Sequence, residues 1–315
     1  MLTQLPKSRR NSSGFLASLL NQPYDLLNQP YEWSTFWRSL KTSPMHIDLS
    51  KHHGLGNDFL VVNIAQADAS FQWSELAQRW CDRRFGVGAD GLLLLEIMQG
   101  NRLAMVLYNA DGSRAEMSGN GIRCLVQAAH WHIAGPEGKP ATYIVDTDAG
   151  ERTVSVESDW HDGSLDISVD MGYVTDLPEP HNWASLGCNP DRPVRHLSMG
   201  NPHSVVGVDD VAMVDLAELG QKVPHVNLEI IEPGPEPHAI TMRVHERGAG
   251  ITLACGTGAC AAAEAAIAWG LVPASTSEVI VHMDGGDAKV RVDSSTRAVT
   301  LIGPAVFIAS ISVHM

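Results

Sequence analysis

The sequence predicts an α+β fold of two pseudo-symmetric domains, in each of which a mixed or antiparallel sheet wraps around one central helix. Three observations lead to this prediction. The chain has 315 residues, enough for two hydrophobic cores. From Met45 onward, strand-like apolar runs alternate with glycine-rich turns. One motif also occurs twice, at Ser118 and at Cys255, where a small polar side chain precedes Gly-x-Gly and an apolar stretch at helical spacing.

The first domain contains the Ser118 motif. Its strands are predicted over residues 59–62, 92–95, 103–108, 142–145 and 152–157, and a further strand is predicted over 165–169, before the connection to the second half. The Asn-Ala-Asp-Gly-Ser sequence at 109–113 is typical of a tight turn, because Asn, Asp and Gly tolerate such backbone geometry. A helix is predicted over 119–134, since apolar residues recur at helical spacing until Gly135 and a following proline end the pattern.

The second domain repeats this plan around Cys255. Its strands are predicted over residues 204–208, 239–244, 279–283, 289–292 and 299–302. An approach loop at 248–255 leads to an alanine-rich helix over 256–269, which Gly270 ends. The small side chains of this helix suit burial among strands.

Domain boundaries follow from the repeat. We expect the first domain to span 45–162 together with a C-terminal strand at 304–315, and the second to span 163–303. Residues 1–44 do not resemble the rest, because they hold a short tandem of Leu-Leu-Asn-Gln-Pro-Tyr and no helix or strand pattern. We expect this segment to be disordered or to come from a mis-assigned start, with Met45 as the physiological start. The basic residues near its start also leave open the alternative that this segment is an organelle-targeting peptide.

The composition excludes several classes of function. A formal charge of −14 argues against nucleic acid or an anionic membrane as a partner, because both need basic surfaces. The most apolar stretch, 251–272, is interrupted by Glu264 and predicts no membrane span. Five cysteines form no paired framework, which fits a reducing compartment and favours the cytoplasm. Neither the cysteine nor the histidine spacing indicates a metal site.

The repeated motif carries the chemistry. Ser118 and Cys255 should each sit where a helix begins, with unpaired backbone N–H groups pointing outward. Such a position lowers the pKa of a thiol and binds carboxylates. Two such groups facing each other across one carbon would remove a proton from one side and return one on the other. That is the geometry of a racemase or epimerase.

Each of these residues also has a purely structural interpretation. A cysteine among alanines is usually a small buried hydrophobe, as we expect for Cys124 and Cys260, and a serine before a helix is usually only its N-cap. The placement of Ser118 and Cys255 at equivalent points of a repeat favours chemistry. The surroundings of Ser118 lack the Gly-x-Ser-x-Gly pattern of a hydrolase nucleophile.

Two other motifs each have more than one interpretation. The sequence at 86–91 satisfies the dinucleotide fingerprint Gly-x-Gly-x-x-Gly, but a strand rather than a helix follows it, which favours a glycine-rich loop near the site. Polar loop residues around His203 and Arg247 suit an amino-acid ligand. An arginine can clamp a carboxylate with two hydrogen bonds, and a surface ion pair is the alternative.

Five ordered motifs resemble those of the diaminopimelate epimerase family: residues 51–59, 109–113, 117–124, 199–203 and 246–260. The resemblance spans about Met45 to the C-terminus. It implies a cofactor-independent isomerase, working without pyridoxal phosphate, that converts LL-diaminopimelate to the meso form in lysine and peptidoglycan biosynthesis. It also implies two pseudo-symmetric domains that close on this small-molecule substrate, and usually a homodimer.

The resemblance further implies roles for individual residues. Cys255 would be the proton acceptor, and Ser118 occupies the position of the proton donor. Helix-start donors for the α-carboxylate of the reacting centre would come from Gly119, Asn120, Gly256 and Thr257. The distal amino-acid centre would be held by Asn57, Asn109, Asn201, Asn227, Glu246 and Arg247. His203 and Glu246 would tune the acid–base pair. Gly91 stands where some members have glutamine, so one polar substrate contact would be missing.

Ser118 is the main departure, because the family places cysteine there and uses two thiols. A hydroxyl is a much weaker acid than a thiol, whose pKa is roughly 8.5. We therefore expect reduced or altered proton return, which only helix-start donors or a relaying water would offset. Three alternatives stay open: a related racemase-fold enzyme with one working base (a dehydratase or another amino-acid epimerase), a serine introduced by substitution to trap substrate, and a catalytically silent amino-acid-binding protein. The intact Cys255, Glu246 and Arg247 argue against the last.

Overall fold

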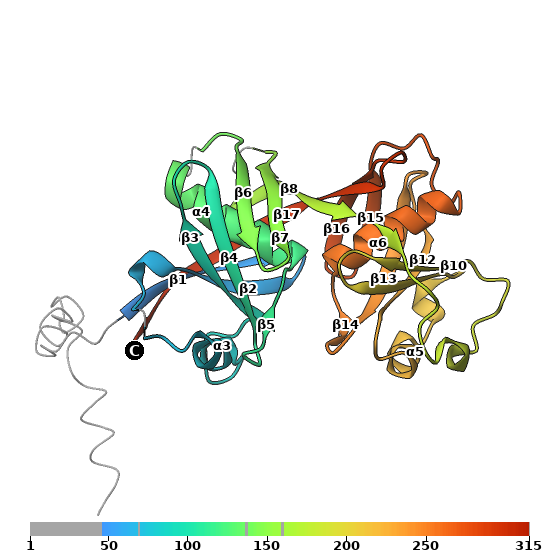
Figure 1. Ribbon diagram of the computed structural model, residues 1–315, viewed down its shortest axis with the longest axis horizontal. Helices are drawn as coiled ribbons and strands as arrows, with labels where there is room; N and C mark the ends of the chain where they lie inside the picture. Colours follow the sequence, from blue (N-terminus) through green and yellow to red (C-terminus); the bar gives the residue numbers. More distant parts are fainter. Residues whose placement is uncertain (1–45, 69, 136–137, 159–160, 315) are drawn as a thin grey trace, which may run out of the picture. The chain divides into compact units, whose positions relative to one another are not determined.

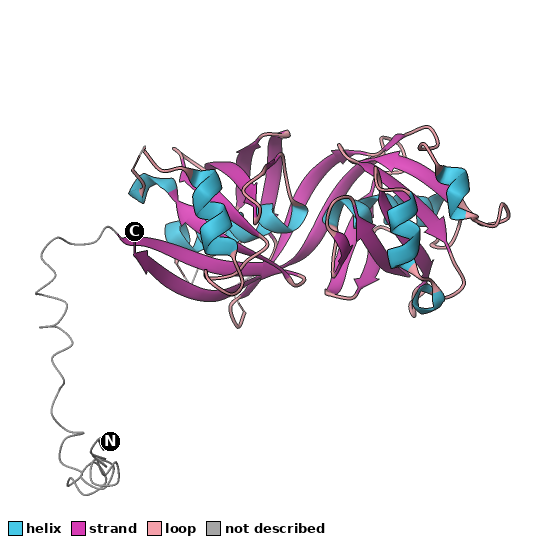
Figure 2. Cartoon of the chain, turned by 90° about the horizontal axis from the view of Figure 1, so that it is seen from below, coloured by secondary structure: helices cyan, strands magenta, loops and turns pink. Residues whose placement is uncertain are grey.

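The computed structural model describes residues 46–68, 70–135, 138–158 and 161–314, and these residues have the α+β architecture that the sequence predicts. The segment 1–44, for which we expect disorder or a mis-assigned start, lies outside the described residues. Strands dominate the described chain, and two long helices, α4 (Gly119–Ala134) and α6 (Gly256–Ala268), lie among them (Figure 2).

The first half of the fold is a mixed sheet with a fixed order of pairings. Its strands are β1 (His46–Gly54), β2 (Asn57–Asn63), β3 (Gly91–Ile97), β4 (Arg102–Asn109), β5 (Arg114–Ala115), β6 (Thr142–Thr147), β7 (Gly150–Val156) and β8 (Ser164–Tyr173). Neighbours pair antiparallel, except that β2 pairs in parallel with β3 and β4 with β6. Helix α4 provides the crossover that the parallel pair β4 and β6 requires.

The second half repeats this order strand for strand (Figure 1). Its strands are β10 (Val194–Ser198), β11 (Pro202–Gly207), β12 (Asn227–Pro233), β13 (Ala239–Glu246), β14 (Gly250–Thr252), β15 (Val279–Met283), β16 (Gly286–Val292) and β17 (Ala298–His314). The parallel pairs are now β11 with β12 and β13 with β15, and α6 provides the crossover. The repeat confirms the predicted pseudo-symmetry.

Two segments of the chain link the halves by pairing with strands of both. β17 pairs with β16 through its first residues and with β1 through its last. β8 pairs with β7 and with β17, and the short strand β9 (Thr175–Asp176) that follows it pairs with β10. Each half is therefore closed by a strand that the chain brings from the other half.

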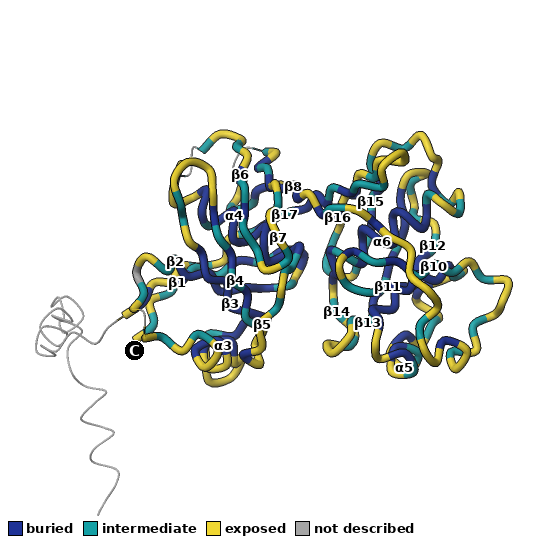
Figure 3. Tube along the Cα trace, viewed as in Figure 1, coloured by how far each residue is buried: buried dark blue, intermediate teal, exposed yellow. Residues whose placement is uncertain are grey.

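Both long helices are buried along most of their length (Figure 3). In α6 the alanines at 261–263, 265 and 266 are fully buried, as the composition of this helix predicts. In α4 the larger apolar residues Ile122, Leu125 and Val126 are fully buried. Removing such side chains from water contributes about 1.5–3 kcal/mol each, so the helix positions are fixed mainly by apolar burial.

Several elements fall outside the sequence predictions. Helix α3 (Trp73–Cys81) is one, although Leu76, Ala77 and Trp80 give it one buried face. The other helices are α5 (Leu216–Lys222) and the 3₁₀ helices η2 (Ile64–Gln66), η3 (Trp183–Leu186) and η4 (Val211–Met213). The strands β1, β5, β9, β10 and β12 are also unpredicted, and β14 forms within the segment 248–255 that was predicted to be a loop. The predicted strands at 299–302 and 304–315 belong to one continuous strand, β17, because antiparallel pairing with β8 and β1 carries it through to His314.

Candidate active site

Ser118 and Cys255 cap the two buried helices. Ser118 has an extended backbone, and its Oγ accepts a hydrogen bond from the Gly121 N–H at 3.0 Å. Cys255 also has an extended backbone, and its Sγ accepts one from the Gly258 N–H at 3.4 Å. Both side chains therefore lie at the first turn of a helix, where the backbone dipoles favour negative charge.

The two helix starts meet. A Cβ atom on Gly119 would lie 3.6 Å from the Cα of Gly256, and one on Gly256 would lie 3.5 Å from the Cα of Gly119. The same two atoms would approach the Cδ2 of Leu301 to 3.0 and 2.9 Å. Glycine at both positions lets the helices begin in contact. Ser118 and Cys255, each one residue earlier, therefore flank the same junction.

Four backbone donors at this junction are unused among the described residues. They are the N–H groups of Gly119, Asn120, Gly256 and Thr257. These are the first two positions of each helix, where no intrahelical acceptor exists. Together with the two helix dipoles, they form a site suited to a carboxylate.

The Cys255 thiol differs from the sequence prediction. A helix start alone predicts a lowered pKa, but burial raises the pKa of Cys255 well above its ordinary value. The carboxylates of Glu246 and Glu229 raise the pKa further, and the donors at Thr257 and Gly258 offset only part of the increase. The predicted lowering is therefore wrong. Burial and the two carboxylates thus favour the thiol form of Cys255, and a positive charge beside the sulfur would favour the thiolate.

A buried dyad that the sequence analysis does not single out lies next to the first turn of α6. Glu229 Oε1 lies 2.6 Å from His203 Nδ1, and both side chains are completely buried. A Cβ atom on Gly258 would lie 2.7 Å from the same oxygen, so glycine is needed there. Burial raises the pKa of Glu229, and the nearby His203 opposes part of that shift. The available sequence signal was a single acid inside the apolar run 228–231.

Hydrogen bonds connect this dyad to Cys255. Asn201 Oδ1 lies 3.0 Å from His203 Nε2, and Asn201 Nδ2 donates to Thr257 Oγ1 at 3.3 Å. Thr257 Oγ1 in turn lies 3.5 Å from Cys255 Sγ. Because the Thr257 oxygen already accepts from Asn201, its own hydrogen is available to the sulfur. These hydrogen bonds thus connect four residues that the sequence predicts for the site: His203, Asn201, Thr257 and Cys255.

The predicted clamp residues lie at the end of β13. Asn227 Oδ1 accepts from the Arg247 N–H at 2.9 Å, and Asn227 Nδ2 donates to the Pro202 carbonyl at 3.1 Å. Glu246 Oε1 accepts from the Thr252 hydroxyl at 2.5 Å. The Arg247 side chain is exposed and has no ion-pair partner within the described ranges. Its guanidinium is therefore available to a carboxylate, and the surface ion pair is not observed.

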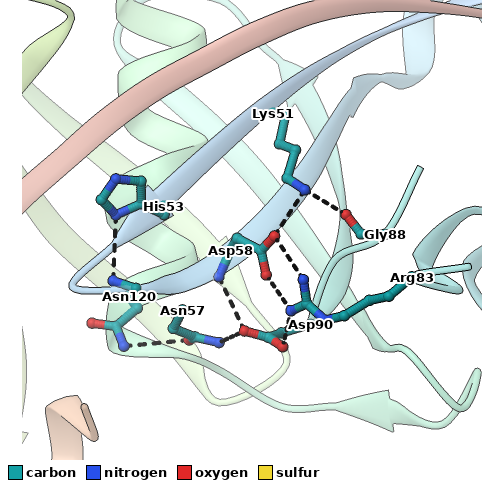
Figure 4. Close-up of polar contacts among 9 residues, drawn as sticks. Lys51, His53, Asn57, Asp58, Arg83, Gly88, Asp90 and Asn120 are labelled. Atoms are coloured by element: carbon teal, nitrogen blue, oxygen red, sulfur yellow. Dashed lines mark hydrogen bonds and ion pairs between the residues drawn. The ribbon is translucent and has the colours of Figure 1, made fainter. Parts of the chain in front are cut away.

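In the first half, Asn57 and Asn120 form a pair (Figure 4). Asn120 Nδ2 donates to Asn57 Oδ1 at 3.3 Å, and Asn57 Nδ2 donates to Asp90 Oδ2 at 2.8 Å. The completely buried Arg123 donates to Asn120 Oδ1 at 2.7 Å. Neither Asp90 nor Arg123 was predicted from the sequence. Asp90 meets Asn57 only through the fold, whereas Arg123 binds Gly119 O and Asn120 Oδ1 of its own helix, together with Pro304 O from a distant strand.

Among the described residues, Asn109 makes no side-chain hydrogen bond to the other predicted binding residues. Its exposed side chain donates to Ser113 Oγ at 3.0 Å within its own turn. In the sheet it lies opposite Gly91. A Cβ atom on Gly91 would lie 2.8 Å from the Tyr108 carbonyl oxygen, so a glutamine there would require the backbone to shift.

The remaining sequence motifs do not add a second site. The glycine-rich loop 86–91 follows helix α3 and precedes β3, which reverses the order that a dinucleotide fingerprint requires. Within the part of the chain that the structure describes, no group of three His, Cys, Asp or Glu side chains could hold a metal ion. None of the described helices is long and apolar enough to span a membrane.

Comparison with known proteins assigns the family. The model of the diaminopimelate epimerase family matches residues 49–176 and 196–308. The chain belongs to this family. The diaminopimelate epimerases of Thermosynechococcus vestitus and Synechocystis sp. are each 38% identical to it, over 84% and 83% of this chain and 99% and 96% of theirs. The family is one of isomerases, which is the enzyme class that the repeated motif predicts.

Solved structures share the fold at low sequence identity. A PhzF-family phenazine biosynthesis protein of Bacillus anthracis has a TM-score of 0.65 and 14% identity, covering 86% of this chain and 99% of its own. A probable proline racemase of Agrobacterium radiobacter has a TM-score of 0.59 and 16% identity, covering 85% and 93%. This likeness shows the fold alone and says nothing about the substrate.

Proposed function

We propose that this chain converts LL-2,6-diaminopimelate to the meso form by proton transfer at Cα, without a cofactor. The observation that supports this most is the junction of two helix starts, one capped by Ser118 and the other by Cys255. Two proton-carrying groups at equivalent points of a repeated fold suit a carbon that loses a proton from one face and gains one on the other.

The α-carboxylate of the reacting centre would bind the four unused N–H groups at the start of α4 and α6. Loss of the α-proton leaves negative charge that spreads onto this carboxylate. Fixed donors and helix dipoles that face the carboxylate stabilise such charge without having to reorganise. The residues that supply them are Gly119, Asn120, Gly256 and Thr257.

Cys255 would take the α-proton, and Ser118 would return one. The raised pKa of Cys255 makes its thiolate a strong base once formed, and the ammonium groups of the substrate bring positive charge that favours the thiolate. Ser118 is a much weaker acid than the cysteine of the family. The Gly121 N–H bonded to its Oγ would stabilise the alkoxide in part, and a water between the hydroxyl and the carbon is the other route.

The distal amino-acid centre would be held by polar side chains from both halves. They are Asn57, Asn109, Asn201, Asn227, Glu246 and Arg247. The exposed guanidinium of Arg247 suits bidentate binding of the distal carboxylate, whereas Glu246 and the amide oxygens suit the ammonium. His203 and Glu246 would set the proton affinity of the acid–base pair.

We also propose the domain division that the sequence suggests, with 45–162 and 304–315 in one domain and 163–303 in the other. The pairing of the last residues of β17 with β1 supports that assignment. Strand β8, which pairs with β7 of the first half and with β17, would then be the segment in which the chain passes from one domain to the other. The two domains would close on the substrate, and the protein would work as a homodimer in the cytoplasm, in lysine and peptidoglycan biosynthesis.

The test is incubation of the purified protein with LL-diaminopimelate in deuterated water, followed by NMR and chiral chromatography. Meso product that carries α-deuterium would support the proposal. Exchange of the α-proton without inversion would leave Cys255 as the only working base and would contradict the role of Ser118. Absence of both would contradict the proposal and favour another amino-acid substrate or a silent binding protein.

A further inference from the structure

The amides of Asn57 and Asn120 belong to a hydrogen-bonded chain whose direction is fixed at both ends. At one end the guanidinium of Arg123 donates to Asn120 Oδ1, and at the other the carboxylate of Asp90 accepts from Asn57 Nδ2. A guanidinium only donates, and an ionised carboxylate only accepts. If either amide turned over, two donors or two acceptors would face each other.

Asp90 is itself held in place (Figure 4). Its Oδ1 accepts from Arg83 Nη2 at 2.6 Å, and its Oδ2 also accepts from the Asp58 N–H at 3.1 Å. Its backbone N–H donates to the Asp58 carbonyl at 2.9 Å, and its carbonyl accepts from the Ala110 N–H at 3.0 Å. The carboxylate therefore has a defined position relative to β2, the strand that carries Asn57.

Arg123 fixes the opposite end. Its guanidinium is completely buried and donates only to carbonyl-type oxygens: Gly119 O at 3.0 Å, Pro304 O at 3.4 Å and Asn120 Oδ1 at 2.7 Å. Among the described residues no carboxylate pairs with it. Because Arg123 cannot accept a hydrogen bond, Asn120 must present its oxygen to it and its NH₂ group to Asn57.

We propose that Asp90 is a positioning residue for substrate binding, which holds the Asn57 amide with its oxygen directed at Asn120 and at the distal ammonium of the substrate. This inference rests on the proposed function. With Nδ2 committed to Asp90, the second lone pair of Asn57 Oδ1 is the acceptor left for the ammonium. The proposal also gives a role to the loop 86–91, whose glycines do not serve a dinucleotide.

The first test compares two isosteric substitutions. Asp90→Asn keeps the shape but offers either an oxygen or an NH₂ group to Asn57, so the orientation is no longer imposed. Asp58→Asn is the matched control, because Asp58 binds the same Arg83 nitrogen at 2.6 Å and Lys51 at 2.9 Å without a side-chain contact to Asn57.

For Asp90→Asn we expect the KM for LL-diaminopimelate to rise about tenfold, which corresponds to the loss of roughly one hydrogen bond to the substrate. We expect kcat to stay within about twofold of the wild-type value. For Asp58→Asn we expect a KM within about twofold of the wild-type value. An unchanged KM in Asp90→Asn, or an equal rise in both variants, would overturn the inference.

A second measurement does not depend on activity. NMR of the side-chain carboxamides in the wild-type protein, assigned with Asn57→Asp and Asn120→Asp, reports on both amides without substrate. We expect their protons to exchange at least about tenfold more slowly than those of Asn182, which is exposed and makes no capping bond. Asp90→Asn should remove this protection at Asn57, and Asp58→Asn should keep it.

The two measurements separate the two ideas. Wild-type exchange at Asn57 as fast as at Asn182 would overturn the role of Asp90 whatever the substrate is. Slow exchange that depends on Asp90, in a protein that does not act on LL-diaminopimelate, would support the positioning role and contradict only the proposed function.

Discussion

For the individual residues, the proposed inversion depends most on the hydroxyl of Ser118. Ser118→Cys should raise kcat for inversion at least about tenfold, because a thiol is several pKa units more acidic than a hydroxyl and each unit is worth about 1.4 kcal/mol. The matched control is Ser118→Ala, which should abolish inversion and leave α-proton exchange by Cys255. Chiral chromatography measures kcat. A kcat for folded Ser118→Cys at or below the wild-type value would contradict the account.

A second residue, Cys255, gives a pH dependence. Burial first, and then Glu246 and Glu229, raise the pKa of its thiol, so the thiolate is expected at higher pH than for an ordinary cysteine. The rate of alkylation by iodoacetamide, followed by mass spectrometry of the Cys255 peptide, should still be rising above about pH 9. Glu246→Gln removes one of these causes and should shift the rise to lower pH. If the alkylation rate of the wild-type protein instead reached a plateau below about pH 8, the helix start would lower the pKa of Cys255 by more than burial raises it.

At the scale of the element, the first turn of α6 is built around a glycine. Gly258→Ala would place a Cβ atom 2.7 Å from the buried Glu229 Oε1, whereas at the equivalent Gly121 of α4 the nearest atom is 3.1 Å away. We expect Gly258→Ala to lower the free energy of unfolding by about 1–3 kcal/mol and to lower kcat. Gly121→Ala should cost less than about 1 kcal/mol, because alanine favours the helix. Equal losses in urea denaturation would contradict this difference between the helices.

At the scale of the whole molecule, one ion-pair cluster ties the linking strands together. Arg195 and Arg297 each contact both Glu264 of α6 and Asp176 of β9. The Glu264 side chain is only 9% exposed. Glu264→Gln should therefore lower the free energy of unfolding by about 2 kcal/mol, because the partly buried Arg195 and Arg297 would each lose one carboxylate partner. Glu278→Gln, whose cationic partners are about half exposed, is the control and should cost less than about 1 kcal/mol. A smaller loss for Glu264→Gln in urea denaturation would refute the prediction.

Local signals predicted the helices and the repeat but not the contacts between distant segments. Helix α4 begins and ends where the sequence predicts, because a polar cap and Gly135 mark its ends. The full length of β17 depends on pairing with β1, about 250 residues earlier, which no local pattern reports. Glu229 and Asp90 were missed for the same reason, since His203 and Asn57 come from other strands. The pKa of Cys255 was predicted in the wrong direction because its burial is a tertiary property.

In the proposed mechanism, Cys255 and Ser118 act on opposite faces of one carbon, and return of the proton by Ser118 is the slow step. The protein is incubated with LL-diaminopimelate in deuterated water and sampled early in turnover. The ratio of deuterium in recovered LL-diaminopimelate to deuterium in the meso product is the direct test of this mechanism. For the wild-type protein we expect deuterium in both compounds, because slow proton return by Ser118 gives Cys255 time to exchange its proton with solvent and hand a deuteron back. In Ser118→Cys the label in recovered LL-diaminopimelate should fall relative to the meso product. An unchanged ratio would mean that residue 118 does not deliver the proton, and would contradict the account.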